Sequence, residues 1–464
     1  MSTQIPPTPD AVQQELYAKR EKIYPREVHG LFASARVTAA VALLGIFYVM
    51  PWLSWDGRQA VLLDLPARKF HVLGLTFWPQ DFLFLTFLLM LAAFSLFFFT
   101  ALAGRLWCGY ACPQTVWTES FLWIERMVEG TRQQQMKLDR GPWNARKLRL
   151  KLTKHAIWIV FAAFTGFTFV AYFTPARELL AKLIAFDMGP WETFWVGFYG
   201  FATYGNAGWL REQVCMYMCP YARFQSAMFD RDTLIISYDE KRGEPRGSRP
   251  SGADPKSLNL GSCVNCTLCV QVCPTGIDIR KGLQYECIGC AACVDVCDQV
   301  MDKMNYPRGL IRYTTQRALD GGHTKVLRPR ILIYATILCS LTVLFGFRLA
   351  AREPLGLDVL HDRNQLYRET EGLIENVYNL KIINKRDHAQ RYTLTARGLE
   401  GLELRLDVPE IVVPEGGVLN LPARLLARES VLPARSSPIS FTLALADDPA
   451  TAVTTDAVFL GPQP

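Results

Sequence analysis

The chain has 464 residues, of which 50% are hydrophobic and 20% are charged, and it carries a formal net charge of +7. This length suggests about three domains. The positive charge lies mainly in segments that flank apolar runs, which is typical of membrane topology signals rather than of nucleic-acid binding. Because the sequence has no helix-turn-helix, zinc-finger or aromatic-basic pattern, we expect no nucleic-acid partner.

Residues 1–34 form a polar segment whose basic residues include Lys19, Arg20, Lys22 and Arg26. No short apolar run with a small-residue cleavage site follows it, so we predict that no signal peptide is removed. The first hydrophobic segment would then act as an uncleaved anchor, and residues 1–34 would be a cytoplasmic N-terminal segment.

Apolar stretches indicate a membrane domain. A helix needs about 20 apolar residues to cross a bilayer. The fourth of the five stretches is the weakest, because Glu192, Tyr204 and Asn206 interrupt it, and a re-entrant or interfacial helix is the alternative there. We predict a polytopic α-helical membrane domain of about five spans. The stretches are Ala35–Trp52, Phe82–Ala103, Ala156–Thr174, Trp191–Leu210 and Ile331–Ala350.

The distribution of Lys and Arg predicts the orientation of these spans. Residues 105–155 hold ten Lys and Arg against four Asp and Glu, whereas the loop 53–81 holds only three Lys and Arg. We therefore expect the N-terminus, residues 105–155 and residues 211–330 on the cytoplasmic side of a bacterial inner membrane. Five spans would then place the C-terminal region in the periplasm.

Eight cysteines form two runs with the spacing C-x2-C-x2-C-x3-C, namely CVNCTLCVQVCP at 263–274 and CIGCAACVDVCD at 287–298. In this pattern three close cysteines wrap one [4Fe-4S] cluster and the fourth reaches the other cluster. The alternative is a zinc module, since C-x2-C pairs also suit zinc. Cluster one would use Cys263, Cys266, Cys269 and Cys297, and cluster two would use Cys287, Cys290, Cys293 and Cys273.

The two runs resemble bacterial dicluster ferredoxins, with one departure. The first run keeps the proline after its last cysteine, Pro274, whereas the second has Asp298 there. This change should alter the local turn without removing a ligand. Intact clusters need a reducing compartment, which agrees with a cytoplasmic placement.

Four further cysteines form a repeated dithiol, C-G-Y-A-C-P at 108–113 and C-M-Y-M-C-P at 215–220. Each copy follows the second helix of a predicted hairpin, so the repeat could bring Cys108, Cys112, Cys215 and Cys219 together. Residues i and i+4 share a helical face, so each pair would present both sulfurs together if its turn is helical. A proline suits the first position of a new helix. A cysteine at that helix N-terminus should have a lowered thiol pKa.

Soft thiolates suit Cu(I), so these four cysteines are candidates for a redox-active dithiol or a metal site. Two alternatives stay open: structural cysteine pairs that pack a helix end, and a third iron–sulfur cluster. Residues 116–128 predict a short amphipathic helix on the membrane surface.

After the last span the sequence changes to short alternating runs, such as RYTLTA and ISFTLAL, separated by turn residues. This pattern predicts an antiparallel, immunoglobulin-like β-sandwich. The Gly- and Pro-rich stretch 239–261 predicts a loop that leads into an inserted α+β ferredoxin-like domain. The predicted domains are 1–34, the membrane domain 35–235 with four spans, the ferredoxin-like domain 236–325, the fifth span 326–352 and the periplasmic β-domain 353–464.

The full order of these features resembles the cytochrome c oxidase accessory proteins of the CcoG/FixG/RdxA type. Further matching motifs are YDEKRGEPRG at 238–247, DRNQLYRE at 362–369 and IENVYNLK at 374–381. The resemblance implies reduction of Cu(II) to Cu(I) for maturation of a cbb3-type oxidase, with copper handled by Cys108, Cys112, Cys215 and Cys219. It also implies oxidase assembly factors and a copper chaperone or transporter as partners. The electron donor stays unknown.

Three functions therefore compete. The first is a cupric reductase that serves oxidase assembly, which would make the chain an oxidoreductase. The second is a quinol dehydrogenase subunit that passes electrons to a periplasmic reductase; such short subunits lack the C-terminal β-domain. The third is a non-enzymatic scaffold whose clusters are structural.

Overall fold

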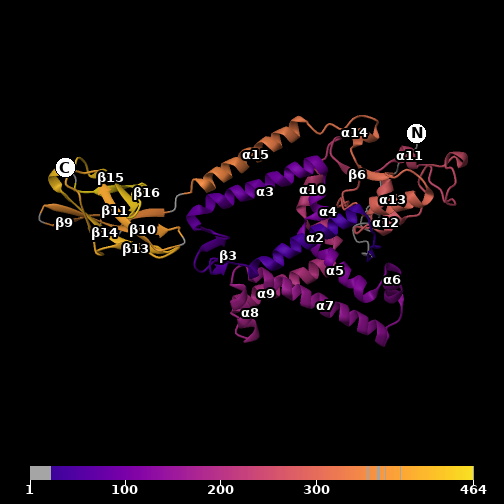
Figure 1. Cartoon of the computed structure of the whole chain (residues 1–464), viewed down its shortest axis with the longest axis horizontal. Coiled ribbons are helices and arrows are strands. Elements are labelled where there is room, and N and C mark those ends of the chain that lie inside the picture. The colour runs from indigo at the N-terminus through magenta and orange to yellow at the C-terminus, as the bar shows by residue number, and fades with distance from the viewer. Residues whose placement is uncertain (1–21, 353–354, 363–365, 371, 387, 463–464) are drawn as a thin grey trace, which may run out of the picture. The chain divides into compact units, whose positions relative to one another are not determined.

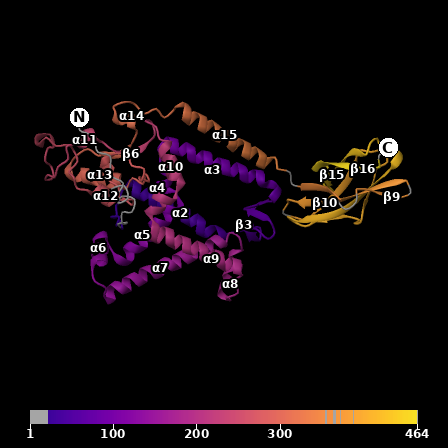
Figure 2. The same cartoon turned by 180° about the vertical axis from the view of Figure 1, so that it is seen from behind.

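The computed structural model describes residues 22–352, 355–362, 366–370, 372–386 and 388–462. Lys19 and Arg20, and residues 363–365 of the motif at 362–369, lie outside this part of the chain. The chain divides between Thr342 and Val343 into two compact units (Figures 1 and 2). The first holds the cysteine motifs and the apolar helices up to residue 342. The second begins with the last turns of the final apolar helix, residues 343–350, and then consists mainly of β-strands.

Among the residues that the structure describes, four helices are long and apolar enough to cross a membrane. They correspond to four of the five predicted spans, and their ends lie within a few residues of the prediction except at the start of the third, which begins earlier. The first is Leu31–Trp52, made of α2 (Leu31–Val49) and a 3₁₀ turn. The second is Pro79–Ala103, made of a 3₁₀ turn and α3 (Phe82–Ala103). The other two are α7 (Ala145–Val170) and α15 (Pro329–Ala350).

The fourth predicted span has a different form. Helix α9 (Pro190–Thr203) continues directly into the π-helix η3 (Tyr204–Leu210), so the regular α-helix is short. Helix α9 lies along α7 (Figure 1). A Cβ atom at Gly166 of α7 would overlap the carbonyl oxygen of Val196, so this glycine permits a close crossing of the kind that small residues allow between membrane helices.

Short elements connect the spans. The predicted loop after α2 folds as five short strands, of which β3 (Val61–Asp64), β4 (Lys69–Val72) and β5 (Leu75–Phe77) form an antiparallel sheet. The other two strands of this loop are β1 (Ser54–Trp55) and β2 (Arg58–Gln59). The remaining connecting elements are helical: α4 (Leu106–Tyr110), α5 (Pro113–Glu129), α6 (Arg132–Arg140), α8 (Ala176–Ile184), the π-helix η4 (Val214–Met218) and α10 (Pro220–Ala227).

The ferredoxin-like part is α+β, as predicted. Strand β6 (Ile235–Tyr238) pairs antiparallel with β7 (Ile311–Thr314), and helices α12 (Leu268–Gln271) and α13 (Ala292–Met304) pack together beside them. Its core contains buried apolar residues that bring the two strands and α13 together: Ile236, Tyr238, Val294, Met301, Leu310 and Ile311. The short helices α11 (Glu240–Gly243) and α14 (Gln316–Leu319) flank it.

The second unit is a β-sandwich. One sheet has the order β12–β14–β10–β8, with β9 also paired to β10, and the other has the order β13–β11–β15–β16. Alternate residues of β10 and β15 are buried, as expected for strands with one face on a core. The strands are β8 (Leu355–His361), β9 (Arg368–Thr370), β10 (Leu373–Asn384), β11 (Gln390–Arg397), β12 (Glu403–Leu406), β13 (Ile411–Val413), β14 (Val418–Arg428), β15 (Ser436–Leu445) and β16 (Ala452–Leu460).

The motif IENVYNLK connects the two sheets of this sandwich. The buried Asn376 side chain donates to the carbonyl of Leu460 at 2.7 Å and accepts from its N–H at 2.9 Å. The Tyr378 hydroxyl donates to the carbonyl of Val458 at 2.8 Å. Because Asn376 and Tyr378 lie on β10 and their partners on β16, these side chains satisfy polar groups across the core.

Candidate metal centre

The two cysteine runs fold with the same backbone. Around the second cysteine of each run, the flanking residues have positive φ: Asn265 (54°) and Thr267 (57°) in the first, Gly289 (70°) and Ala291 (57°) in the second. Three of these four residues are not glycine, so both loops adopt a conformation that side chains rarely take. Each loop then begins a helix, α12 or α13.

Each set of four predicted ligands lines its own small cavity. The cavity at the first run is lined by Cys263, Cys266, Cys269 and, from the second run, Cys297. The cavity at the second run is lined by Cys287, Cys290, Cys293 and, from the first run, Cys273, with Cys269 also at its wall. The exchange of the fourth cysteine between runs is therefore present in the folded chain.

The surroundings of the two cavities are mainly apolar, but the first also contains Arg280. Arg280 is paired with Asp278 at 2.7 Å and donates to Asn265 at 2.8 Å. Among the described residues, no three Cys, His, Asp or Glu side chains lie close enough together to hold a single metal ion. Two sets of four thiols, each around its own cavity with its fourth cysteine taken from the other run, match the pattern of two cubane clusters.

The structure explains why the second run has Asp298 where the first run has Pro274. Helix α13 continues through Cys297 and Asp298 to Met304, and a proline inside it would remove a hydrogen bond and clash with the preceding turn. The first run ends its helix at Gln271, so Pro274 is tolerated there. The Asp298 carboxylate accepts from the N–H of Gly309 at 2.9 Å.

The C-x-Y-x-C-P motifs differ from the predicted helical pairs. The first cysteine of each lies in a helix, Cys108 in α4 and Cys215 in η4, but the second is an extended residue that precedes the next helix. Cys112 has φ −62° and ψ 128°, and Cys219 has φ −82° and ψ 109°. The prediction that the two cysteines of each motif share one helical face is therefore wrong. The predicted proline at the start of the next helix is present in both copies.

The two motifs are held together by reciprocal contacts. The Cys108 thiol lies 3.2 Å from the side-chain oxygen of Gln225 on α10, which follows the second motif. Gln114, which follows the first motif, donates to the carbonyls of Asn206 and Arg211 at 2.9 and 3.0 Å. The thiols lie close enough for charge on one to raise the pKa of another, so the four are brought to one place.

Burial raises the thiol pKa values in this region, including that of Cys112, whose predicted lowering at the helix N-terminus is therefore wrong. It raises the pKa of Cys108 to about 12 and that of Cys215 to about 11. Burial also raises the pKa of Cys112, although the backbone N–H groups of Thr115 and Gln114 at the start of α5 act in the opposite direction. Without a bound cation these three thiols are protonated at neutral pH, and a metal would have to displace the protons.

A direct contact joins the first motif to the second cluster loop. Gly109 lies between Cys108 and Cys112, and Gly289 lies between Cys287 and Cys290. A Cβ atom at Gly109 would be 2.9 Å from the carbonyl carbon and oxygen of Gly289. The backbones of the two loops therefore touch. The Tyr313 hydroxyl also donates to the carbonyl of Gly289.

The chain makes the same break before both motifs. Gly104, four residues before Cys108, has φ 57° and ψ −120°. Arg211, four residues before Cys215, has φ 46° and ψ −113°. Arg211 is thus a bulky residue in a glycine-like conformation, which is strained. The π-helices on either side of it are a type that often occurs at functional sites.

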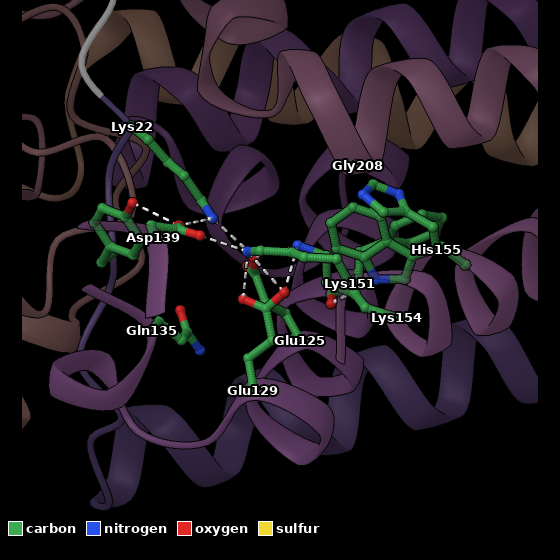
Figure 3. Close-up of polar contacts among 12 residues, drawn as sticks. Lys22, Glu125, Glu129, Gln135, Asp139, Lys151, Lys154, His155 and Gly208 are labelled. Atoms are coloured by element: carbon green, nitrogen blue, oxygen red, sulfur yellow. Dashed lines mark hydrogen bonds and ion pairs between the residues drawn. The ribbon is translucent and has the colours of Figure 1, made fainter. Parts of the chain in front are cut away.

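A buried ionic network stabilises this strained turn. Arg211 is paired with Glu125 of α5 at 2.8 Å, and Lys22 and Lys154 bind the same carboxylate at 3.0 and 3.2 Å. Figure 3 shows Lys22 and Lys154 converging on Glu125, with Glu129 beside them. Glu125 follows the first motif and Arg211 precedes the second, so the pair joins the two halves of the thiol site.

Replacement of Glu125 by Gln should destabilise the protein. Burial opposes ionisation of this carboxyl, but Arg211, Lys22 and Lys154 outweigh it and lower its pKa to about 2. Loss of the charge leaves buried cations uncompensated, which costs about 3–5 kcal/mol. Thermal unfolding in detergent measures the loss. The control is Glu178→Gln, which removes an exposed pair with Lys182 and should leave the unfolding temperature almost unchanged.

The ionised Glu125 carboxyl also predicts a dependence of stability on pH. A carboxyl whose folded pKa lies below its usual 4.5 stabilises the fold above pH 4.5, and this contribution fades as pH falls toward 2. The difference in stability between the wild type and Glu125→Gln should therefore shrink on acidification through this range. A constant difference would show that the charge of Glu125 is not what stabilises the fold.

Comparison with known proteins adds the family. Residues 210–316 match the 4Fe-4S dicluster domain model, residues 83–128 match a 4Fe-4S binding domain model, and residues 345–462 match the model of the IG-like fold at the C-terminal of FixG. The predicted dicluster and immunoglobulin-like regions are thereby confirmed.

Relatives cover most of the chain. The nitrogen fixation protein FixG of Rhizobium meliloti is 41% identical over 85% of this chain and 83% of its own length. Protein RdxB of Cereibacter sphaeroides is 41% identical over 86% of this chain and 87% of its own length. Protein RdxA of the same organism is 38% identical over 86% of this chain and 88% of its own length.

A crystal structure of a FixG-related protein from Vibrio parahaemolyticus is 35% identical, covers 24% of this chain and 97% of its own, and has a TM-score of 0.22. The full-length relatives, the dicluster model and the apolar helices agree with one another. The chain therefore belongs to the FixG/RdxA family, as a membrane protein that carries two [4Fe-4S] clusters and acts in electron transfer.

Proposed function

We propose that the chain passes single electrons from its two clusters to the four thiols of the C-x-Y-x-C-P motifs, where Cu(II) is reduced to Cu(I). The contact between Gly109 and Gly289 carries this proposal, because it places the backbone of a dithiol motif against the loop between Cys287 and Cys290. Two centres whose loops touch are suited to electron exchange.

The ligand assignment follows the two cavities. Cluster one is held by the four cysteines at the first cavity, and cluster two by Cys273 and the three close cysteines of the second run. The clusters supply one-electron storage. The chain supplies apolar walls that exclude water, and Arg280 supplies a positive charge beside the first cavity.

Copper is the substrate that best suits the thiol centre. Each Cu(II) that gains one electron becomes Cu(I), and Cu(I) prefers soft thiolate ligands. Cys108, Cys112, Cys215 and Cys219 provide four such thiols in one region, partly buried. No three of them lie close enough to hold one ion as they stand, so copper would have to draw them together. Protonated thiols become ligands by losing their protons to the metal, so copper binding at this site should release protons.

The biological setting is part of the same proposal. The Lys and Arg bias favours a cytoplasmic location for the N-terminus and the ferredoxin-like domain, in a bacterial inner membrane, with the β-domain in the periplasm. The Cu(I) would serve maturation of a cbb3-type cytochrome c oxidase. The partners would be oxidase assembly factors and a copper chaperone or transporter.

Replacement of all four motif cysteines by Ser tests the proposal. Purified, dithionite-reduced and desalted protein would receive Cu(II) under anaerobic conditions, and a Cu(I)-specific chelator would report the product. The wild type should form about one Cu(I) for each electron stored. The quadruple variant should lose most of this reaction, because serine oxygen is a poor ligand for Cu(I).

Iron analysis makes the result decisive. The variant should keep the iron content and the visible spectrum of the wild type, since none of its changes touches the two cavities. Equal Cu(I) formation by the variant and the wild type would overturn the proposal. A fall in iron content would instead assign a third cluster to these thiols.

A further inference from the structure

A cavity lies between the two redox sites. Its volume is about 380 Å³, and its walls include Cys290 of the second cluster run and Cys215 of the second dithiol motif. Small-molecule sites usually have volumes of about 300–1,000 Å³. An occupant would therefore touch a predicted cluster ligand and a predicted copper ligand at once.

One wall belongs to a membrane span. Ala33, Ser34, Val37 and Thr38 of the first two turns of α2 line the cavity, and α2 begins a helix that is long and apolar enough to cross a bilayer. Val37 is 57% exposed, so this wall is open to the surroundings of the helix. A ligand can reach the cavity from the lipid side.

The opposite walls are mixed. Leu122, Val272 and Ile288 are apolar, whereas Thr118, Glu119 and Arg126 offer polar groups. The Arg126 guanidinium is paired with Glu119 at 3.0 Å, yet its buried Nε atom has no hydrogen-bond partner. A flat ring with oxygen atoms at its edge would satisfy both kinds of wall.

Residues 22–30 close the cavity as a strap held at both ends. At one end the Tyr24 hydroxyl donates to Asp139 at 2.7 Å, and Lys22 is paired with the same carboxylate at 3.1 Å (Figure 3). In the middle of the segment the N–H of Arg26 donates to the carbonyl of Gln271 at 2.8 Å, and near its other end the Gln299 side chain donates to the carbonyl of His29. Val28 packs on Val272 and Ala292 of the ferredoxin-like part. The strap gives the cavity a defined wall.

We infer that this cavity binds the head group of a membrane-soluble quinol, which is the electron donor of the protein. This inference rests on the proposed function. A quinol has an apolar tail that suits entry beside α2, a ring that suits the apolar wall, and two oxygens that suit Thr118 and Arg126.

The electrons balance with the proposed reaction. Oxidation of one quinol to the quinone releases two electrons and two protons. Each of the two [4Fe-4S] clusters takes one electron, and each passes it to one Cu(II), so one quinol yields two Cu(I). The protons leave through the polar wall, where the Glu119 side chain, 40% exposed, reaches solvent.

Binding can be measured without turnover. The fluorescent quinone analogue heptylhydroxyquinoline N-oxide would be titrated with purified full-length protein in detergent. We expect saturable quenching with one site, and displacement by decylubiquinone. Val37→Trp should weaken binding by at least about tenfold, because an indole overfills the space. Ile46→Trp is the control, since Ile46 is similarly exposed at 59% on α2 but is absent from the cavity wall.

A second measurement tests the role as donor. Anaerobic addition of decylubiquinol should produce the EPR signal of reduced clusters in the wild type and in Ile46→Trp, but not in Val37→Trp. All three proteins should still oxidise dithionite-reduced clusters with Cu(II), which separates this inference from the proposed function. Equal binding by Val37→Trp and the wild type would overturn the inference. So would displacement of the analogue by anionic phospholipid alone, or binding without cluster reduction.

Discussion

Gly109→Ala should slow the oxidation of the reduced clusters by Cu(II) while both clusters stay in place. The new Cβ atom would lie 2.9 Å from the carbonyl carbon and oxygen of Gly289, so one loop must move. Electron transfer slows steeply as the distance between two centres grows, so the rate should fall several-fold. Stopped-flow absorbance of the clusters after addition of Cu(II) measures the change.

The control for this variant is Gly45→Ala. Gly45 also lies in a helix, but nothing lies within 4 Å of a Cβ atom placed there. The control should keep the rate of the wild type. If Gly109→Ala reacts as fast as Gly45→Ala, the contact between the two loops is not the route of the electrons. Iron content must be equal in all three proteins for the comparison to hold.

Cys273→Ala and Cys297→Ala should each remove the cluster of the opposite run. Cys273 belongs to the first run but lines the second cavity, and Cys297 belongs to the second run but lines the first. Each change should lower iron and sulfide by about half, because a cluster of this type needs four thiolates. EPR of the reduced protein should show one remaining signal in each variant.

The remaining signals identify which cluster is lost. Arg280→Met should shift the potential of the cluster that survives in Cys273→Ala, because Arg280 lines the first cavity, and should leave the cluster that survives in Cys297→Ala unchanged. A shift in the opposite variant would show that each run keeps its own four cysteines. Cys339→Ala, at an exposed cysteine of α15, is the control for loss of a cysteine alone.

The cysteine runs could be predicted because their chemistry restricts spacing. Four thiolates around a compact cluster leave few spacings, so Cys263 to Cys297 indicated both ligand sets. The spans and the sandwich followed from apolar length and alternation. The fourth span was weaker because Asn206 and the glycines around it favour an irregular helix, which became η3.

Other features depend on contacts that no local pattern contains. The pKa of Cys112 is set by burial under segments distant in sequence, and this outweighs the helix end that the sequence predicted. The contact of Gly109 with Gly289 joins loops 180 residues apart. The only local signals were the short side chains at both positions. Likewise, nothing about an arginine at position 211 indicated a glycine-like backbone. The only signal was its place in the repeat: Arg211 and Gly104 each lie four residues before the first cysteine of a motif.

Under the proposed function, electrons stored on the clusters reach Cu(II) through the motif thiols. Anaerobic rapid-freeze EPR tests it most directly, because reduced clusters and Cu(II) both give signals. After mixing, the wild type should lose both signals together, with one Cu(II) consumed for each cluster oxidised. Persistence of both signals would contradict the account, and so would their equally fast loss in protein with Ser at positions 108, 112, 215 and 219.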